Sequence, residues 1–195
     1  MKRLNKKDLV DIKWKNGGGV TRNIATGLIE NVVAWRISRA DVDIEGPFSN
    51  FTGLTRILTI VSQNAMDLEH ADGVLHARAW DPLQFDGGLS VTSRLKDGPL
   101  TDLNLMFDSK VCTGTARVVK GAQVIQAPTS NDLIVVHILA GHPKVGDVIF
   151  ESGDTVFLDA SDHGIVEVGM EDAVLVLTLQ ALDQSDDIKL CIAAR

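Results

Sequence analysis

The residues best suited to chemistry begin with a glycine-rich loop, Trp14-Lys15-Asn16-Gly17-Gly18-Gly19-Val20-Thr21-Arg22. Three consecutive glycines are costly in backbone entropy, and they permit positive φ angles and close approach by another group. The indole, ammonium and amide beside them put stacking, charge and hydrogen bonding on one short segment. The composition suits the rim of a small-ligand pocket. A glycine bulge between two strands is the alternative interpretation, and the phosphate-loop pattern is missing.

Two arginines lie on expected strands whose faces otherwise carry small or apolar residues. Arg56 alternates with apolar residues in the run 54–61, and Arg36 lies among small residues in the run 32–42. A buried guanidinium needs a carboxylate, carbonyl groups or a ligand, because leaving it unpaired costs on the order of several kcal/mol. Arg56 therefore pairs with Asp102 or another acid, or it anchors a substrate carboxylate through two hydrogen bonds.

A carboxylate and an amide, Asp102 and Asn104, share the second face of the expected strand 98–107. Together they can receive an ammonium or amide group of a ligand. They can equally form the solvated side of an edge strand.

Motifs for metal binding and nucleophilic catalysis are missing. The five histidines include no His-x-His or His-Glu-x-x-His pattern, and the two cysteines form no Cys-x-x-Cys. There is no Gly-x-Ser-x-Gly elbow and no tyrosine. His137 lies on an apolar strand and is expected to be a core residue, and the pair Asp186-Asp187 is expected to be solvated. We therefore expect ligand-holding groups without a metal or another cofactor.

The elements that must position these groups are short strands separated by turns. Alternating or apolar runs are separated mostly by Gly, Pro, Asp and Ser, and no convincing helix exceeds two turns. This spacing predicts an all-β sandwich or barrel. The expected strands are 24–29, 32–42, 54–61, 65–69, 74–80, 89–95, 98–107, 115–119, 122–126, 133–139, 147–150, 155–158, 165–168 and 173–179.

Length and charge limit the classes of function. The 195 residues, 45% hydrophobic and 23% charged, suit one large domain or two small halves. No run is long enough to cross a membrane and no signal core follows the start, so we expect a cytoplasmic protein with free thiols. The net charge of −7 argues against nucleic acid. Residues 1–56 carry ten basic and six acidic side chains; this excess attracts a small anion or docks against the acidic remainder.

Four motifs in the same order resemble the HutD/Ves family. They are Trp14-Lys15-Asn16-Gly17-Gly18-Gly19-x-Thr21, Trp35-Arg36-Ile37-Ser38-x-Ala40-x-Val42, Gly46-Pro47-Phe48-Ser49-x-Phe51-x-Gly53-x-x-Arg56 and Asp102-Leu103-Asn104-Leu105-Met106. The resemblance covers roughly the first 108 residues, and the apolar rhythm continues further. Thr52-Gly53 departs from the family's usual proline-glycine, which alters the stiffness of a loop.

The resemblance implies a bicupin, two packed antiparallel β-barrels of the jelly-roll type, with halves at 1–108 and 109–195. It also implies an accessory role in histidine utilisation or in a stress response, with a dicarboxylate such as formylglutamate as ligand. The histidine set of metal-binding cupins is missing here. The ligand-binding residues that the motifs imply are Lys15, Asn16, Gly17, Gly18, Thr21, Arg36, Ser38, Arg56, Asp102 and Asn104.

Three functions remain open on the sequence. The first is a non-catalytic protein that binds a small anionic metabolite. The second is a metal-independent isomerase or hydrolase acting on a sugar or amino-acid derivative, with Asp102 as its acid–base group. The third is an interaction module, and open sheet edges make a homodimer plausible for it.

Overall fold

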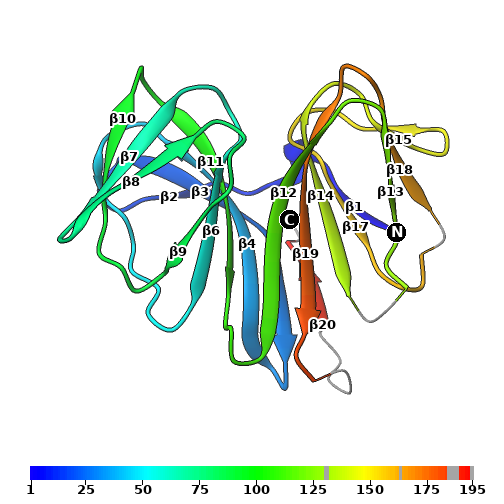
Figure 1. Ribbon diagram of the computed structural model, residues 1–195, viewed down its shortest axis with the longest axis horizontal. Helices are drawn as coiled ribbons and strands as arrows, with labels where there is room; N and C mark the ends of the chain where they lie inside the picture. The colour runs from blue at the N-terminus through cyan, green and yellow to red at the C-terminus, as the bar shows by residue number, and fades with distance from the viewer. Residues whose placement is uncertain (130–131, 163, 184–188, 194–195) are drawn as a thin grey trace.

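The computed structural model describes residues 1–129, 132–162, 164–183 and 189–193, and it folds them into four β-sheets, arranged as two facing pairs in two halves that lie side by side (Figure 1). In the first half, a seven-stranded sheet has the order β2 (Ile12–Lys13), β3 (Gly19–Ile29), β4 (Val32–Val42), β11 (Leu100–Phe107), β6 (Thr55–Ile60) and β9 (Leu83–Asp86), with β20 (Lys189–Ile192) also beside β3. A four-stranded sheet covers it, in the order β5 (Gly46–Pro47), β10 (Thr92–Lys96), β7 (Ala65–His70) and β8 (Gly73–Arg78).

The second half repeats this two-sheet plan. Its larger sheet has the order β1 (Lys2–Leu4), β17 (Thr155–Leu158), β14 (Leu133–Ala140), β19 (Ala173–Ala181) and β12 (Cys112–Lys120). Its smaller sheet has the order β13 (Gln123–Gln126), β18 (Ile165–Val168), β15 (Lys144–Val145) and β16 (Val148–Ile149). Within the described ranges, the helical structure is one 3₁₀ turn, η1 (Lys6–Asp8).

Three apolar cores lie between the sheets. The largest joins the two halves, because side chains such as Trp35 and Leu105 of the first half pack with Val135 and Leu177 of the second. The second half has its own core around Phe150 and Val166, and the first has one around Leu58 and Met66. Strand alternation explains the division, since successive residues of one strand point to opposite faces.

The terminal strands are exchanged between the halves. β1, at the start of the chain, pairs with β17 of the second half, and β20, near its end, pairs with β3 of the first. The boundary predicted at 108/109 falls in the connection between β11 and β12. The first terminal strand thus belongs to the sheet of the second half, and the last belongs to the sheet of the first half.

Most expected strands lie where the sequence pattern puts them, and β4 spans the predicted range 32–42. The run 89–95 is a correction: β10 begins at Thr92, because Leu89 N–H still bonds Asp86 in the preceding turn. The run 74–80 ends at Arg78, and Trp80 has a φ of 63°. The short strands β1, β2, β5, β9, β15 and β20 escaped prediction, since they have too few alternating residues to give a pattern.

Candidate functional site

A pocket of about 650 Å³ opens on the face of the seven-stranded sheet that turns toward β5, β7 and β10. Its polar floor is formed by cross-strand residue pairs of the neighbouring strands β4, β11 and β6. Met106 is paired with Arg36 on one side and Arg56 on the other. Two residues before Met106 on β11, Asn104 pairs with Ser38. Two residues before Asn104, Asp102 pairs with Ala40. Since i and i+2 residues share a face, Arg36 and Ser38 of β4 face this pocket together, and so do Asp102 and Asn104 of β11.

Arg56 is buried at the floor, where 5% of its surface remains exposed. Its Nε donates to Asn104 Oδ1 at 2.7 Å. The guanidinium carbon lies 5.0 Å, 5.8 Å and 5.4 Å from the ring centres of Phe48, Phe51 and Phe85. Burial lowers the pKa of Arg56, but a guanidinium stays charged. The aromatic rings partly compensate this charge, and an anionic ligand would complete the compensation.

Arg36 supplies a second cation in the same register. Its Nη2 donates to Asn23 Oδ1, while its Nε is buried and has no partner among the described residues. One strand separates Arg36 from Arg56, which places their Cα atoms about 10 Å apart at the usual strand spacing. Both arginines line the pocket, with β11 between the strands that carry them.

Asp102 is wholly buried, and its link to Arg56 runs through an amide. Asn104 Nδ2 donates to Asp102 Oδ1 at 2.5 Å, and Asn104 Oδ1 accepts from Arg56. Asp102 Oδ2 has no partner within the described ranges. Burial raises the pKa of Asp102 to about 6, although the charge of Arg56 and the Asn104 hydrogen bond both act to lower it. The direct pair expected for Arg56 is therefore a bridged one.

The glycine-rich loop forms one wall of the pocket. Gly17 has a φ of 73°, and Asn16 Oδ1 accepts from Gly18 N–H at 3.0 Å, which closes a tight turn. Gly19 begins β3, and a Cβ there would lie 2.3 Å from the Asp41 carbonyl oxygen and 3.2 Å from the Trp14 ring. Trp14, Lys15 and Asn16 of this loop therefore line the pocket, whereas the glycines form the turn and the start of β3. A ligand role for the glycines stays a prediction.

Trp14 is held over the pocket by its neighbours. Its Nε1 donates to Thr21 Oγ1 at 2.7 Å, and its ring meets Phe48 edge-on with 6.3 Å between centres. Thr21 therefore positions the indole.

Eight of the ten residues implied as ligand-binding line this one pocket. They are Lys15, Asn16, Thr21, Arg36, Ser38, Arg56, Asp102 and Asn104. Gly17 and Gly18 lie in the adjoining turn and are not part of the lining. Whether these residues bind a ligand stays a prediction.

Sequence reasoning missed several contributors. Phe85 stacks on Arg56 from β9, where it is the cross-strand partner of that arginine. Lys13 and Met106 line the pocket as well. Lys13 could have been predicted from the sequence, since it is two residues before Lys15. Phe85 could not, because the strand that carries it is only four residues long.

The remaining chemical groups behave as core or surface residues. His137 is buried, its Nδ1 lies 2.9 Å from Thr155 Oγ1, and burial lowers its pKa to about 3. Cys112 and Cys191 are both free. Among the described residues, no three His, Cys, Asp or Glu side chains gather as a metal site would require. Asp186-Asp187 and His163 lie outside the described residues.

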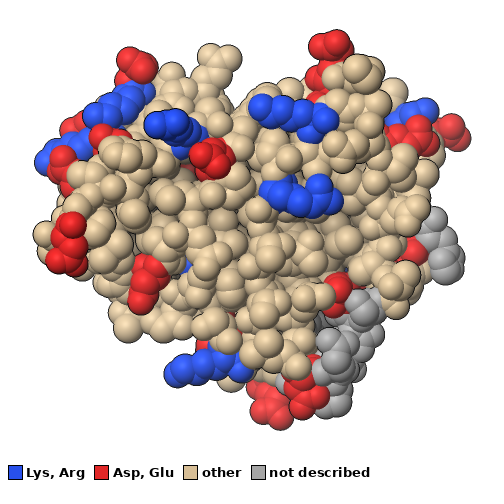
Figure 2. Space-filling model, viewed as in Figure 1, with Lys and Arg blue, Asp and Glu red and all other residues tan. Residues whose placement is uncertain are grey.

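On the face shown in Figure 2, the described acidic and basic side chains are interspersed. In the described part of the chain, no helix is long and apolar enough to span a membrane.

Solved structures with a similar fold cover almost the whole chain. The structure of HutD from Pseudomonas fluorescens SBW25 (formate condition) has a TM-score of 0.80 and 26% identity, over 93% of this chain and 99% of that one. A conserved protein of unknown function from Pseudomonas aeruginosa PAO1 has a TM-score of 0.75 and 23% identity, over 92% and 98%. The Bacillus subtilis oxalate decarboxylase OxdC (S161A) has a TM-score of 0.59 and 8% identity, over 98% and 79%. These matches and the paired two-sheet halves identify the fold as an all-β bicupin.

Sequence comparison is consistent with this fold. An uncharacterized 21.2 kDa protein in the hutC 3′ region of Pseudomonas putida is 34% identical over 108 residues, which are 53% of this chain and 56% of that protein. The match thus spans little more than half of that relative. The family model described as HutD matches residues 6–176. The chain therefore belongs to the HutD family.

Proposed function

We propose that the protein binds a small anionic metabolite in the pocket built by β4, β6 and β11, as a cytoplasmic accessory protein of histidine utilisation. The relative in the hutC 3′ region and the HutD match support the metabolic context. The candidate ligand is a dicarboxylate carrying an amide or formamide group, such as formylglutamate. A role in a stress response is the other context that the family resemblance implies.

One observation carries the proposal: the buried Arg56 makes its hydrogen bond to a neutral amide, and among the described residues its link to the carboxylate of Asp102 runs only through that amide. The cation is therefore incompletely neutralised at the floor of an open pocket. A ligand carboxylate on Arg56 and a second one on Arg36 and Lys15 would neutralise both ends. Charge-assisted hydrogen bonds to guanidinium groups are among the strong ones in proteins.

Calorimetric titration with formylglutamate, glutamate, urocanate and histidine, with and without EDTA, tests the proposal. We expect one dicarboxylate to bind, EDTA to have no effect, and Arg56→Gln to weaken binding at least tenfold. Arg94→Gln is the matched control, because it removes one exposed positive charge from the same half. Unchanged affinity and ligand preference in Arg56→Gln would refute the proposal, and an EDTA-sensitive titration would point to a metal instead.

A second candidate function rests on Asp102. Its unpartnered Oδ2 and its raised pKa suit a group that gives and takes a proton near neutral pH. A metal-independent isomerase or hydrolase of a sugar or amino-acid derivative would use it in this way. Turnover that rises or falls around pH 6 and disappears in Asp102→Asn would favour the enzyme over the binding protein.

A further inference from the structure

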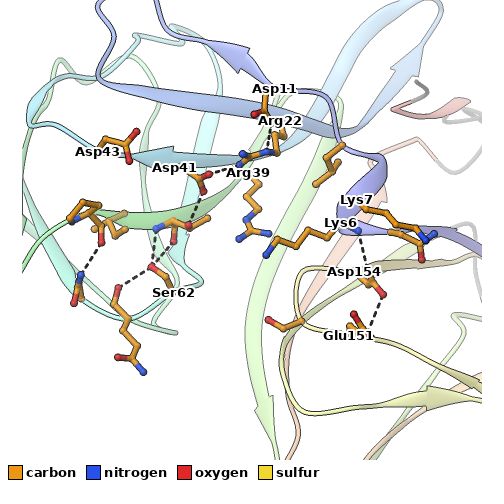
Figure 3. A pocket seen from close by; sticks show the side chains of 18 of the residues that line it. Lys6, Lys7, Asp11, Arg22, Arg39, Asp41, Asp43, Ser62, Glu151 and Asp154 are labelled. Carbon is orange, nitrogen blue, oxygen red and sulfur yellow. Dashed lines mark hydrogen bonds and ion pairs between the residues drawn. The ribbon is translucent and has the colours of Figure 1, made fainter.

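A larger cavity, of about 1230 Å³, lies between the two halves of the molecule (Figure 3). Its walls come from the segment 5–11, from the end of β4, from loops of the first half and from residues 149–154 of the second half. None of the residues implied as ligand-binding lines it. The cavity is thus separate from the pocket of the proposed function, and a ligand could occupy either one without the other.

Arg39 points into this cleft with donors that lack partners. Its Nε and Nη1 are buried and make no hydrogen bond to any described residue. Asp41 is close enough to influence the pKa of Arg39, but its oxygens are already used. They accept from Arg22 Nη1 at 2.6 Å and from Thr101 Oγ1 at 2.8 Å. A buried unsatisfied donor is unfavourable, so these nitrogens require water or an acceptor from a ligand.

Lys6 brings a second cation to the same place. In Figure 3 its side chain extends toward Arg39, whereas Lys7 points away. Both cations pack on Gly153, where an added Cβ would lie 2.9 Å from Arg39 Nη1 and 2.6 Å from the Lys6 Cδ atom. Gly153 has a φ of 96°, so only glycine fits this turn comfortably. The absence of a side chain there lets the two cations converge.

The turn under the two cations is rigidly held. Gly153 N–H donates to the Ile138 carbonyl at 2.9 Å. Asp154 accepts from Lys6 N–H at 2.9 Å and from Glu151 N–H at 3.1 Å, so both of its oxygens serve backbone groups. Behind them lies His137, whose pKa is lowered by burial and then by the charges of Arg39 and Lys6. The imidazole is therefore neutral and does not compensate for either cation.

We propose that this cleft binds a small monocarboxylate, whose oxygens accept hydrogen bonds from Arg39 and Lys6. The charge around the cleft selects the class of ligand, because five acidic side chains line it against four basic ones. A singly charged, compact carboxylate satisfies the two cations without strong repulsion from the acidic wall. Sulfate and phosphate carry more charge and are expected to bind more weakly.

An NMR titration of the ¹⁵N-labelled protein with sodium acetate tests the proposal. The signals to follow are Arg39 Nε–H and the amides of Lys6 and Gly153. We expect saturable shifts with acetate, smaller ones with sulfate, and none beyond the salt effect with chloride at equal ionic strength. Equal shifts with chloride, or no shifts at these three groups, would overturn the proposal and leave water as the partner of Arg39.

Four variants separate this site from its surroundings. Arg39→Gln is expected to weaken acetate binding at least tenfold, and Lys6→Gln, at an exposed residue, gives a second measurement if the first variant folds poorly. Lys7→Gln is the matched control, since it removes a positive charge from the same cleft, and its affinity should stay within twofold. Arg56→Gln should leave these shifts unchanged. Acetate shifts that persist in Arg39→Gln and Lys6→Gln would refute the site.

Discussion

Asp102→Asn is expected to stabilise the protein at neutral pH, although it removes a buried carboxylate beside a buried arginine. The folded protein holds the Asp102 proton up to a pKa of about 6, against the ordinary 3.8 of an aspartate. A difference of roughly two units corresponds to about 3 kcal/mol of unfolding free energy. The folded state binds the proton more tightly, so the contribution of Asp102 to stability is greatest below pH 4 and falls as pH rises through 4 to 6. Asparagine resembles the protonated acid and avoids that loss.

Urea unfolding followed by circular dichroism, at intervals from pH 4 to pH 8, measures the effect. The variant should match the wild type near pH 4 and exceed it by about 3 kcal/mol at pH 7, or roughly 5–10 °C in melting temperature. Asp97→Asn is the control, because Asp97 is exposed and asparagine tolerates its φ of 65°. If Asp102→Asn were less stable at pH 7, or kept the wild-type pH slope, the pKa of Asp102 would not be raised in the folded protein and the bridged arrangement would act as a true ion pair.

Three further outcomes are expected from individual contacts. Gly27→Ala should destabilise the fold by about 3 kcal/mol or more in urea unfolding, because its Cβ would lie 2.0 Å from Trp35 Nε1; Gly46→Ala, where a Cβ meets nothing within 4 Å, should be nearly neutral. Thr21→Val should cost about 1 kcal/mol by leaving the Trp14 N–H unpaired, and should change Trp14 fluorescence, whereas Thr21→Ser should not. Iodoacetamide at pH 8 should label Cys191 much faster than Cys112 by mass spectrometry, because Cys112 is buried and burial raises its pKa to about 11; equal labelling would contradict this.

The fold was largely predictable because its strands are long enough to show alternation. The apolar runs of β14 and β19 indicated central strands, and both lie inside the five-stranded sheet between two cores. The exchange of β1 and β20 between the halves could not be predicted from the sequence. Each is three or four residues long, and only long-range pairing decides which sheet receives it.

The candidate site was predictable to the extent that single strands determine it. Arg36 and Ser38 on β4, and Asp102 and Asn104 on β11, lie two residues apart and had to share a face. Their partners across strands depend on register, which a sequence does not contain. The sequence offered Asp102 as a partner for Arg56, but the register places Asn104 between them. The same limit concealed Phe85, the cross-strand partner of Arg56.

β4 shows why the molecule offers two cavities rather than one. Its even-numbered residues Arg36 and Ser38 line the pocket within the first half, and its odd-numbered residues Arg39 and Asp41 line the cleft between the halves. Before them along the strand, the odd-numbered face contributes Trp35 and Ile37 to the shared core. A shift of β4 by one residue would exchange the two sets and bury Arg39 in the first-half pocket. Trp35 packs against Gly27 of β3 in this register, where a side chain larger than hydrogen would clash with the indole, so this contact favours the register that both cavities depend on.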